Sequence, residues 1–249
     1  MMHGRPRLGV SSCLLGRPVR WNGEHRLHSF LRDRLAPFVE FVEVCPEVEM
    51  GMETPRPPIQ VERLGQELRL RAVNSDEDFT DRMREFAERR VEELRDLQLS
   101  GYVLKSRSPS CGISDAKHFE NGMEVSRGSG LFADTLARNW PELPLIDDEH
   151  GLEDPFSRGL FFLRVFTSAR WKNLAVGGDC DVLATQLKAE RRLFELFEMT
   201  DGRHRIDSSE IVATLLAALR KEPKVRDPEI FEGLFTQSFE PFPRALMEV

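Results

Sequence analysis

In the stretch Arg7-Leu-Gly-Val-Ser-Ser-Cys-Leu-Leu-Gly16, a run typical of a β-strand is followed directly by a turn. The same order of strand and cysteine-bearing turn recurs in Val42-Glu-Val-Cys-Pro-Glu47 and in Tyr102-Val-Leu-Lys-Ser-Arg-Ser-Pro-Ser-Cys-Gly112. Because the carboxyl ends of the strands in an open parallel sheet face one crevice, we expect the three cysteines to meet there. Three thiolates at that place would make a soft, three-point metal site with one position left open.

The remaining hydrophobic pattern alternates strands with helices. Apolar runs predict strands over 7–11, 38–44, 102–104 and 143–146, and a hairpin over 59–73 that turns near Gly65. Apolar residues at helical spacing predict helices over 24–35, 76–97, 131–139 and 154–171. This alternation predicts an α/β protein whose mainly parallel open sheet is flanked by helices.

The pattern changes near residue 172, which predicts a second part of the chain. Gly177-Gly178 interrupts the sequence there, and helices are expected over 182–199 and 208–220. We therefore expect an α/β domain over 1–171 and a smaller, mainly helical C-terminal extension over 172–249. The extension carries 11 Lys or Arg against 14 Asp or Glu, which is not typical of an RNA-binding module.

Composition narrows the class of protein. Of the 249 residues, 40% are hydrophobic and 31% are charged, as in globular proteins. The net charge of −7 disfavours a broadly basic surface for nucleic acid. The sequence has neither an apolar run of 18 residues nor an apolar signal core, so we expect a cytoplasmic protein without a membrane segment. In a reducing compartment its four cysteines are expected to be buried, catalytic or metal-bound.

The cysteine spacing alone leaves the metal open. No two cysteines lie two residues apart and no His-Glu-x-x-His occurs, which argues against a structural zinc knuckle. Thiolate ligands favour zinc, copper(I) or iron–sulfur clusters. A zinc ion with three thiolates and a water, and a cubane cluster with one open iron, both fit the pattern.

The three motifs, taken with Thr54-Pro-Arg-Pro-Pro58, resemble the thiouracil desulfidase family over residues 5–150. The resemblance implies an oxygen-sensitive enzyme with a [4Fe-4S] cluster held by Cys13, Cys45 and Cys111. It implies a fourth iron that has no protein ligand and binds the sulfur of a thiolated pyrimidine. Replacement of C=S by C=O then releases hydrosulfide.

The resemblance also assigns roles to residues beside the cysteines. Glu47 and Ser108 match the family positions for acid/base work and substrate activation. Ser12, Arg56 and Lys105 are our candidates for substrate binding, and Arg56 is held in a stiff loop between prolines, where it could bind a phosphate or a base carbonyl. Cys180 lies outside the matched stretch, and we expect it not to be a ligand.

We expect the substrate to be a small thiolated base or nucleotide, either thiouracil or a 4-thiouridine nucleotide. A tRNA 4-thiouridine desulfidase is the alternative, because a related group fuses this domain to a second one. An iron–sulfur sensor or scaffold without turnover and a zinc hydrolase are alternatives from other classes. Glu47 beside an open iron favours the enzyme, since a sensor needs no acid/base group.

Overall fold

The computed structural model describes residues 5–177, and Arg7–Glu153 form one compact unit within them. The last described helix, α5 (Pro155–Gly177), belongs to a second unit and agrees with the helix predicted over 154–171. The helices predicted over 182–199 and 208–220, and Cys180, lie outside the described residues. The domain boundary at residue 171 stays a prediction. No helix in the described part combines the length and the apolar character needed to cross a lipid bilayer.

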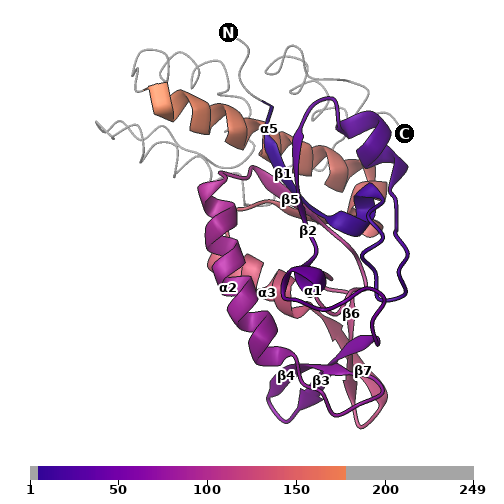
Figure 1. The fold of residues 1–249 in the computed structure, drawn as a ribbon. Coiled ribbons are helices and arrows are strands. Elements are labelled where there is room, and N and C mark those ends of the chain that lie inside the picture. Colours follow the sequence, from indigo (N-terminus) through magenta and orange to yellow (C-terminus); the bar gives the residue numbers. More distant parts are fainter. Residues whose placement is uncertain (1–4, 178–249) are drawn as a thin grey trace. The chain divides into compact units, whose positions relative to one another are not determined.

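The first sheet is the parallel sheet predicted from the sequence. It contains β1 (Arg7–Ser11), β2 (Glu40–Val44), β5 (Gly101–Leu104) and β8 (Leu145–Asp147) in the order β2-β1-β5-β8 (Figure 1). Every neighbouring pair is parallel. From β1 the chain moves to one side to form β2 and later returns to the other side to form β5. The order therefore reverses between β1 and β5, and ligands in open α/β sheets bind outside the carboxyl ends of the strands at such a point.

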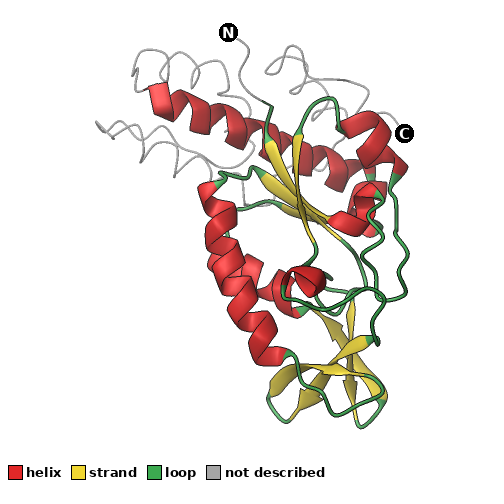
Figure 2. Cartoon of the chain, viewed as in Figure 1, coloured by secondary structure: helices red, strands yellow, loops and turns green. Residues whose placement is uncertain are grey.

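A second four-stranded sheet has the order β4-β3-β6-β7. It is the lower group of yellow strands in Figure 2. The predicted hairpin is β3 (Ile59–Leu64) with β4 (Glu67–Ala72). It pairs in parallel through β3 with β6 (Ala116–Glu120), which forms its own hairpin with β7 (Met123–Gly128). The sequence analysis missed that second hairpin, although both residues of its Asn121-Gly122 turn take positive φ, at 50° and 78°. Asn-Gly between two strands is a strong hairpin signal.

The helix predicted over 24–35 is wrong for its first half. Only the short η2 (Phe30–Leu35), a turn of π-helix, forms there. The N–H groups of Arg26 and His28 donate to the carbonyls of Cys13 and Leu14, at 2.9 Å each, instead of to a helix of their own. These residues therefore lie across the turn that carries Cys13 and are hydrogen-bonded to it.

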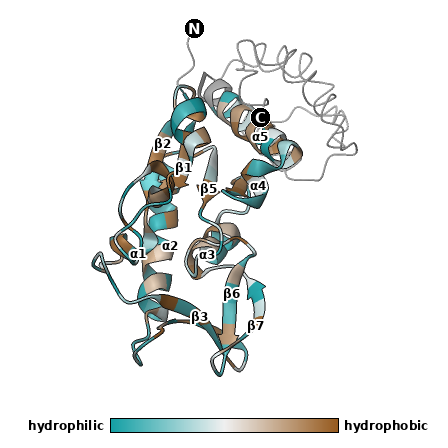
Figure 3. Cartoon of the chain, turned by 90° about the vertical axis from the view of Figure 1, so that its right-hand side faces the viewer, coloured by the Kyte–Doolittle hydropathy of each residue, from teal (hydrophilic) through white to brown (hydrophobic). Residues whose placement is uncertain are grey.

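Helices α2 (Thr80–Asp96) and α3 (Leu131–Asn139) pack on each other and supply much of the core. Polar and apolar residues alternate along α2 (Figure 3), as in a helix with one buried face. It starts four residues later than predicted because Asp78 Oδ1 accepts the N–H of Thr80 at 2.9 Å. In the core, the ring of Tyr102 lies so near Gly9 that a Cβ there would come within 2.3 Å of a ring atom.

Candidate active site

The carboxyl ends of β1, β2 and β5 border a cavity of about 290 Å³. This volume is close to the lower end of the range for small-molecule sites, ~300–1,000 Å³. All eight residues singled out from the sequence line the cavity: Ser12, Cys13, Cys45, Glu47, Arg56, Lys105, Ser108 and Cys111. The structure thus brings together segments that are up to 99 positions apart in the chain.

Each cysteine follows a strand of the parallel sheet. Cys13 lies in η1 (Ser12–Leu15), a turn of 3-10 helix directly after β1. Cys45 follows β2 and is the N-cap of α1 (Pro46–Glu49), whose first position is occupied by Pro46. Cys111 closes the turn after β5. Cys13 and Cys111 are buried, Cys45 is partly buried, and none forms a disulfide.

Burial keeps the thiols protonated. It is the largest influence on all three, and it raises the pKa of Cys13 to about 12, that of Cys45 above its ordinary value, and that of Cys111 well above it. The pKa of Cys111 is raised further by both other thiols, which indicates that the three groups are close enough to repel as thiolates. Because a metal binds the thiolate, it must displace these protons, and binding strengthens as the pH rises.

These shifts predict slow, strongly pH-dependent alkylation of the metal-free protein. At pH 8 a thiol with a pKa of about 12 is ionised only about once in 10⁴ molecules, against roughly a quarter for an ordinary cysteine. We expect the rate of reaction of Cys13 with iodoacetamide, followed by peptide mass spectrometry, to rise about tenfold per pH unit up to pH 10. The chain in denaturant, where the rate should level off near pH 9, is the control. A plateau near pH 9 in the folded protein would contradict the assignment.

Glu47 is the carboxylate of the cavity. It lies on α1, its side chain is 13% exposed, and both of its oxygens are engaged. Oε1 accepts the hydroxyl of Ser110 at 2.9 Å, and Oε2 accepts Nε and Nη2 of Arg56 at 3.0 and 2.5 Å. A carboxylate held on both sides in this way has a fixed orientation toward the cavity.

Arg56 is buried, with a side chain 4% exposed, and its guanidinium group is saturated. Besides Glu47, its N–H groups donate to the carbonyls of Val19 and Glu53 and to the hydroxyl of Thr54, at 2.9, 3.2 and 3.1 Å. All five donors of the group are therefore used inside the protein. This arrangement favours a positioning role for Arg56 over the direct substrate contact expected from the sequence.

The serines near the thiols differ in what their hydroxyl groups contact. Ser108 Oγ accepts the N–H groups of Ser110 and Cys111, at 3.2 and 3.1 Å, which shapes the turn. Its own proton meets no acceptor in the described part of the chain, so it remains available for a ligand. Ser11 Oγ accepts the N–H of Lys105 at 3.0 Å and thereby ties β1 to the end of β5. Ser12 is buried and lines the cavity.

A buried acidic group pairs with Lys105 and was missed by sequence reasoning. Asp148, with a side chain 3% exposed, lies 3.2 Å from Lys105 Nζ and accepts the N–H and hydroxyl of Ser106, both at 2.6 Å. It directly follows β8 and lies two residues before α4 (His150–Glu153), so Lys105 is held by the neighbouring strand end. The signal that could have found it is the run Asp147-Asp-Glu149 after a predicted strand.

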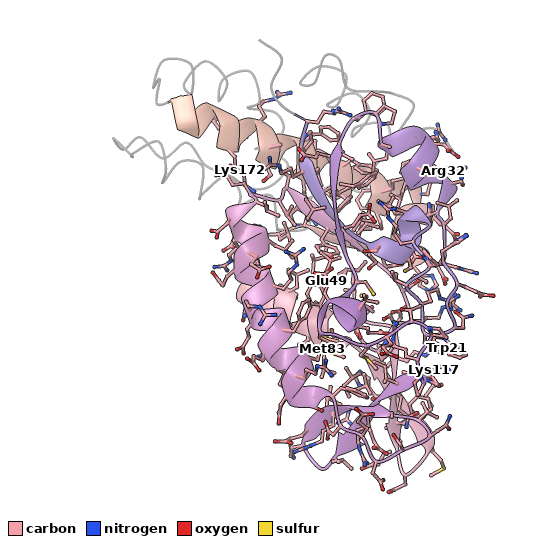
Figure 4. The ribbon with its side chains drawn as sticks, in the orientation of Figure 1. Trp21, Arg32, Glu49, Met83, Lys117 and Lys172 are labelled. Carbon is pink, nitrogen blue, oxygen red and sulfur yellow. The ribbon has the colours of Figure 1, made fainter. Side chains whose placement is uncertain are left out.

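Glu49, also missed from the sequence, fixes the Cys45 turn from outside the cavity. Figure 4 labels Glu49 beside α1. Its Oε1 accepts the Cys45 N–H at 2.8 Å, and its Oε2 pairs with Arg90 of α2 at 2.9 Å. Partial burial raises the pKa of the Glu49 carboxyl. The turn of one thiol is thus anchored to the long helix of the core.

The donor set at the cavity suits a metal cluster. Within residues 5–177, no three His, Cys, Asp or Glu side chains are grouped closely enough to hold one metal ion. The three thiols border one cavity. Three cysteine donors at one cavity fit a group of several metal atoms in which each thiolate binds a different iron.

Sequence similarity to known proteins covers most of this unit. The family model for 2-thiouracil desulfurase matches residues 8–148. The chain is 33% identical over 133 residues to the uncharacterized protein YbbK of Bacillus subtilis (strain 168), an alignment that spans 51% of this chain and 87% of the relative. A solved structure of the [4Fe-4S]-dependent thiouracil desulfidase TudS is 28% identical, with a TM-score of 0.49, over 60% of this chain and 95% of that chain.

Proposed function

Because the chain belongs to the 2-thiouracil desulfurase family, we propose that it is an enzyme that removes sulfur from a thiolated pyrimidine. Water supplies the oxygen that converts C=S to C=O, and the sulfur leaves as hydrosulfide, so no oxidant or reductant is consumed. The observation that carries the proposal is the cavity itself. Three thiols and the doubly held carboxylate of Glu47 border the same small space.

Cys13, Cys45 and Cys111 would hold a [4Fe-4S] cluster. When bound, such a cluster with one iron free of protein ligands supplies a thiophilic Lewis acid for the departing sulfur. The neutral, buried thiols suit this role because they are ionised only when a metal takes the place of their protons. The cluster assignment rests on the donor set that borders the cavity.

The chain's own residues supply the remaining chemistry. We assign Glu47 as the general base that takes a proton from the attacking water, since Arg56 and Ser110 hold its two oxygens in place. We assign the free hydroxyl proton of Ser108 to a polar atom of the pyrimidine ring, where a hydrogen bond makes the ring carbon more electrophilic. Ser12 and Lys105 remain candidate substrate contacts at the cavity wall.

A substrate panel tests the proposal. We expect the protein, reconstituted with iron and sulfide without oxygen, to release sulfide from 2-thiouracil, 4-thiouracil or 4-thiouridine monophosphate. Sulfide would be measured together with the matching oxygenated product. The same protein without its cluster is the control and should be inactive.

The panel also includes tRNA that carries 4-thiouridine. Release from this tRNA alone would establish the tRNA desulfidase alternative. No release from any member of the panel would favour the sensor or scaffold alternative and contradict the enzyme.

A further inference from the structure

Trp21 is the open aromatic side chain of the cavity. It lines the cavity and is 46% exposed, whereas Trp140 and Trp171 are 9% and 0% exposed. Figure 4 labels it on the loop between η1 and η2. Within residues 5–177, no aromatic ring or cationic group stacks on the indole of Trp21. A large ring that is left open at the wall of a binding cavity is unusual for a side chain that only stabilises the fold.

The loop that carries Trp21 is tightly bonded. The Gly23 N–H donates to the Arg20 carbonyl at 2.8 Å, and the Arg20 N–H donates to the Glu24 carbonyl at 3.1 Å. Gly23 takes a φ of 78°, which glycine adopts without strain. The exposed indole is thus presented by a closed turn.

Arg56 links this turn to the carboxylate of the cavity. Its backbone N–H donates to the carbonyl of Trp21 at 2.8 Å, and its side chain donates to the carbonyl of Val19 and to Glu47. One buried residue therefore ties the backbone of Trp21 to the carboxylate of the proposed base.

We propose that the indole of Trp21 is a stacking platform for the pyrimidine ring of the substrate, an inference that rests on the proposed function. Every pyrimidine ring has a π-face, so stacking would hold thiolated and oxygenated rings equally well. Selection of the thiolated ring would then depend on the metal that binds its sulfur. The substrate class is thus a flat pyrimidine, and any ribose or phosphate attached to it lies outside this contact.

Two substitutions separate stacking from simple packing. Trp21→Phe keeps an aromatic face, and Trp21→Leu keeps an apolar side chain without one. We expect Trp21→Leu to raise the KM for the thiolated substrate by about 5- to 150-fold, with kcat changed by less than about threefold. Trp21→Phe should stay within about threefold of the unsubstituted protein in KM. The Kd for uracil, measured by calorimetry on the reconstituted protein, should follow KM.

Met123→Ala is the matched control, since Met123 on β7 is 68% exposed and lies outside the cavity. The unsubstituted protein gives an independent readout, because saturating uracil should shield the exposed Trp21 from acrylamide quenching. Unchanged KM and Kd in Trp21→Leu, or no shielding by uracil, would overturn the inference.

The two proposals fail in different ways. Sulfide release with a normal KM in Trp21→Leu would contradict the stacking role of Trp21 and still support the desulfidase. Uracil binding that depends on Trp21, without any sulfide release, would contradict the desulfidase and still support a pyrimidine-binding site.

Discussion

Replacing Cys13, Cys45 or Cys111 with Ala is expected to abolish both cluster binding and sulfide release. Loss of residues that merely support a metal ligand already costs about 10- to 100-fold in affinity or activity, so loss of a ligand should cost more than about 100-fold. Iron and sulfide content, visible absorbance and the rate of sulfide release, all measured without oxygen, check the result. Circular dichroism of the metal-free variants checks that the fold is kept.

Cys180→Ala is the control for this experiment. The sequence predicts that Cys180 is not a ligand, so this variant should keep the cluster and the activity. A cluster retained in one of the three Ala variants, or lost in Cys180→Ala, would show that the ligand set is wrongly assigned.

Replacing Glu47 with Gln is expected to spare the cluster and to lower kcat by about 10²- to 10⁴-fold, the usual contribution of a general base. The amide keeps an acceptor for the Ser110 hydroxyl but cannot take a proton from water. KM should change little, because the water and not the substrate is the partner of this carboxylate. Steady-state sulfide release and the absorbance of the bound cluster are the measurements.

Glu47→Gln also leaves the buried charge of Arg56 without its anion, since the Arg56 side chain is only 4% exposed. Removing one partner of a buried pair costs roughly 3–5 kcal/mol of stability. Unfolding in urea therefore separates this loss from the catalytic one. Arg56→Lys is the matched variant, because it keeps the charge and the base but loses the paired contact. Full activity in Glu47→Gln would refute the role of Glu47, and loss of the cluster in the same variant would make that role structural.

Much of the catalytic unit could be predicted from local sequence. The parallel strands were predictable because each is a short β-type run followed by a turn, and that rule also placed the three thiols in one crevice. The helix expected over 24–35 failed because the N–H groups of Arg26 and His28 bond to the Cys13 turn, a long-range contact that no local pattern encodes.

The parts of the site that escaped prediction are those that depend on tertiary contacts. From the sequence, Arg56 was expected to bind substrate because it lies in a stiff loop between prolines. Only the folded chain shows that all five of its donors are used inside the protein. Asp148 was visible as an acidic residue after a strand, but its pairing with Lys105 depends on β5 and β8 being neighbours. Trp21 has an ordinary place in a polar loop, and its exposure beside the cavity follows from the turn that carries it.

The distribution of the thiols over three parallel strands has a consequence for how the protein matures. During synthesis, Cys13 and Cys45 leave the ribosome well before Cys111, which follows 66 positions later, and parallel pairing of β1 with β5 is a slow, long-range event. The complete ligand set exists only after that pairing. We therefore expect cluster insertion to act on the folded chain, and a bound cluster to stabilise that chain by mass action, because the unfolded chain offers no equivalent site.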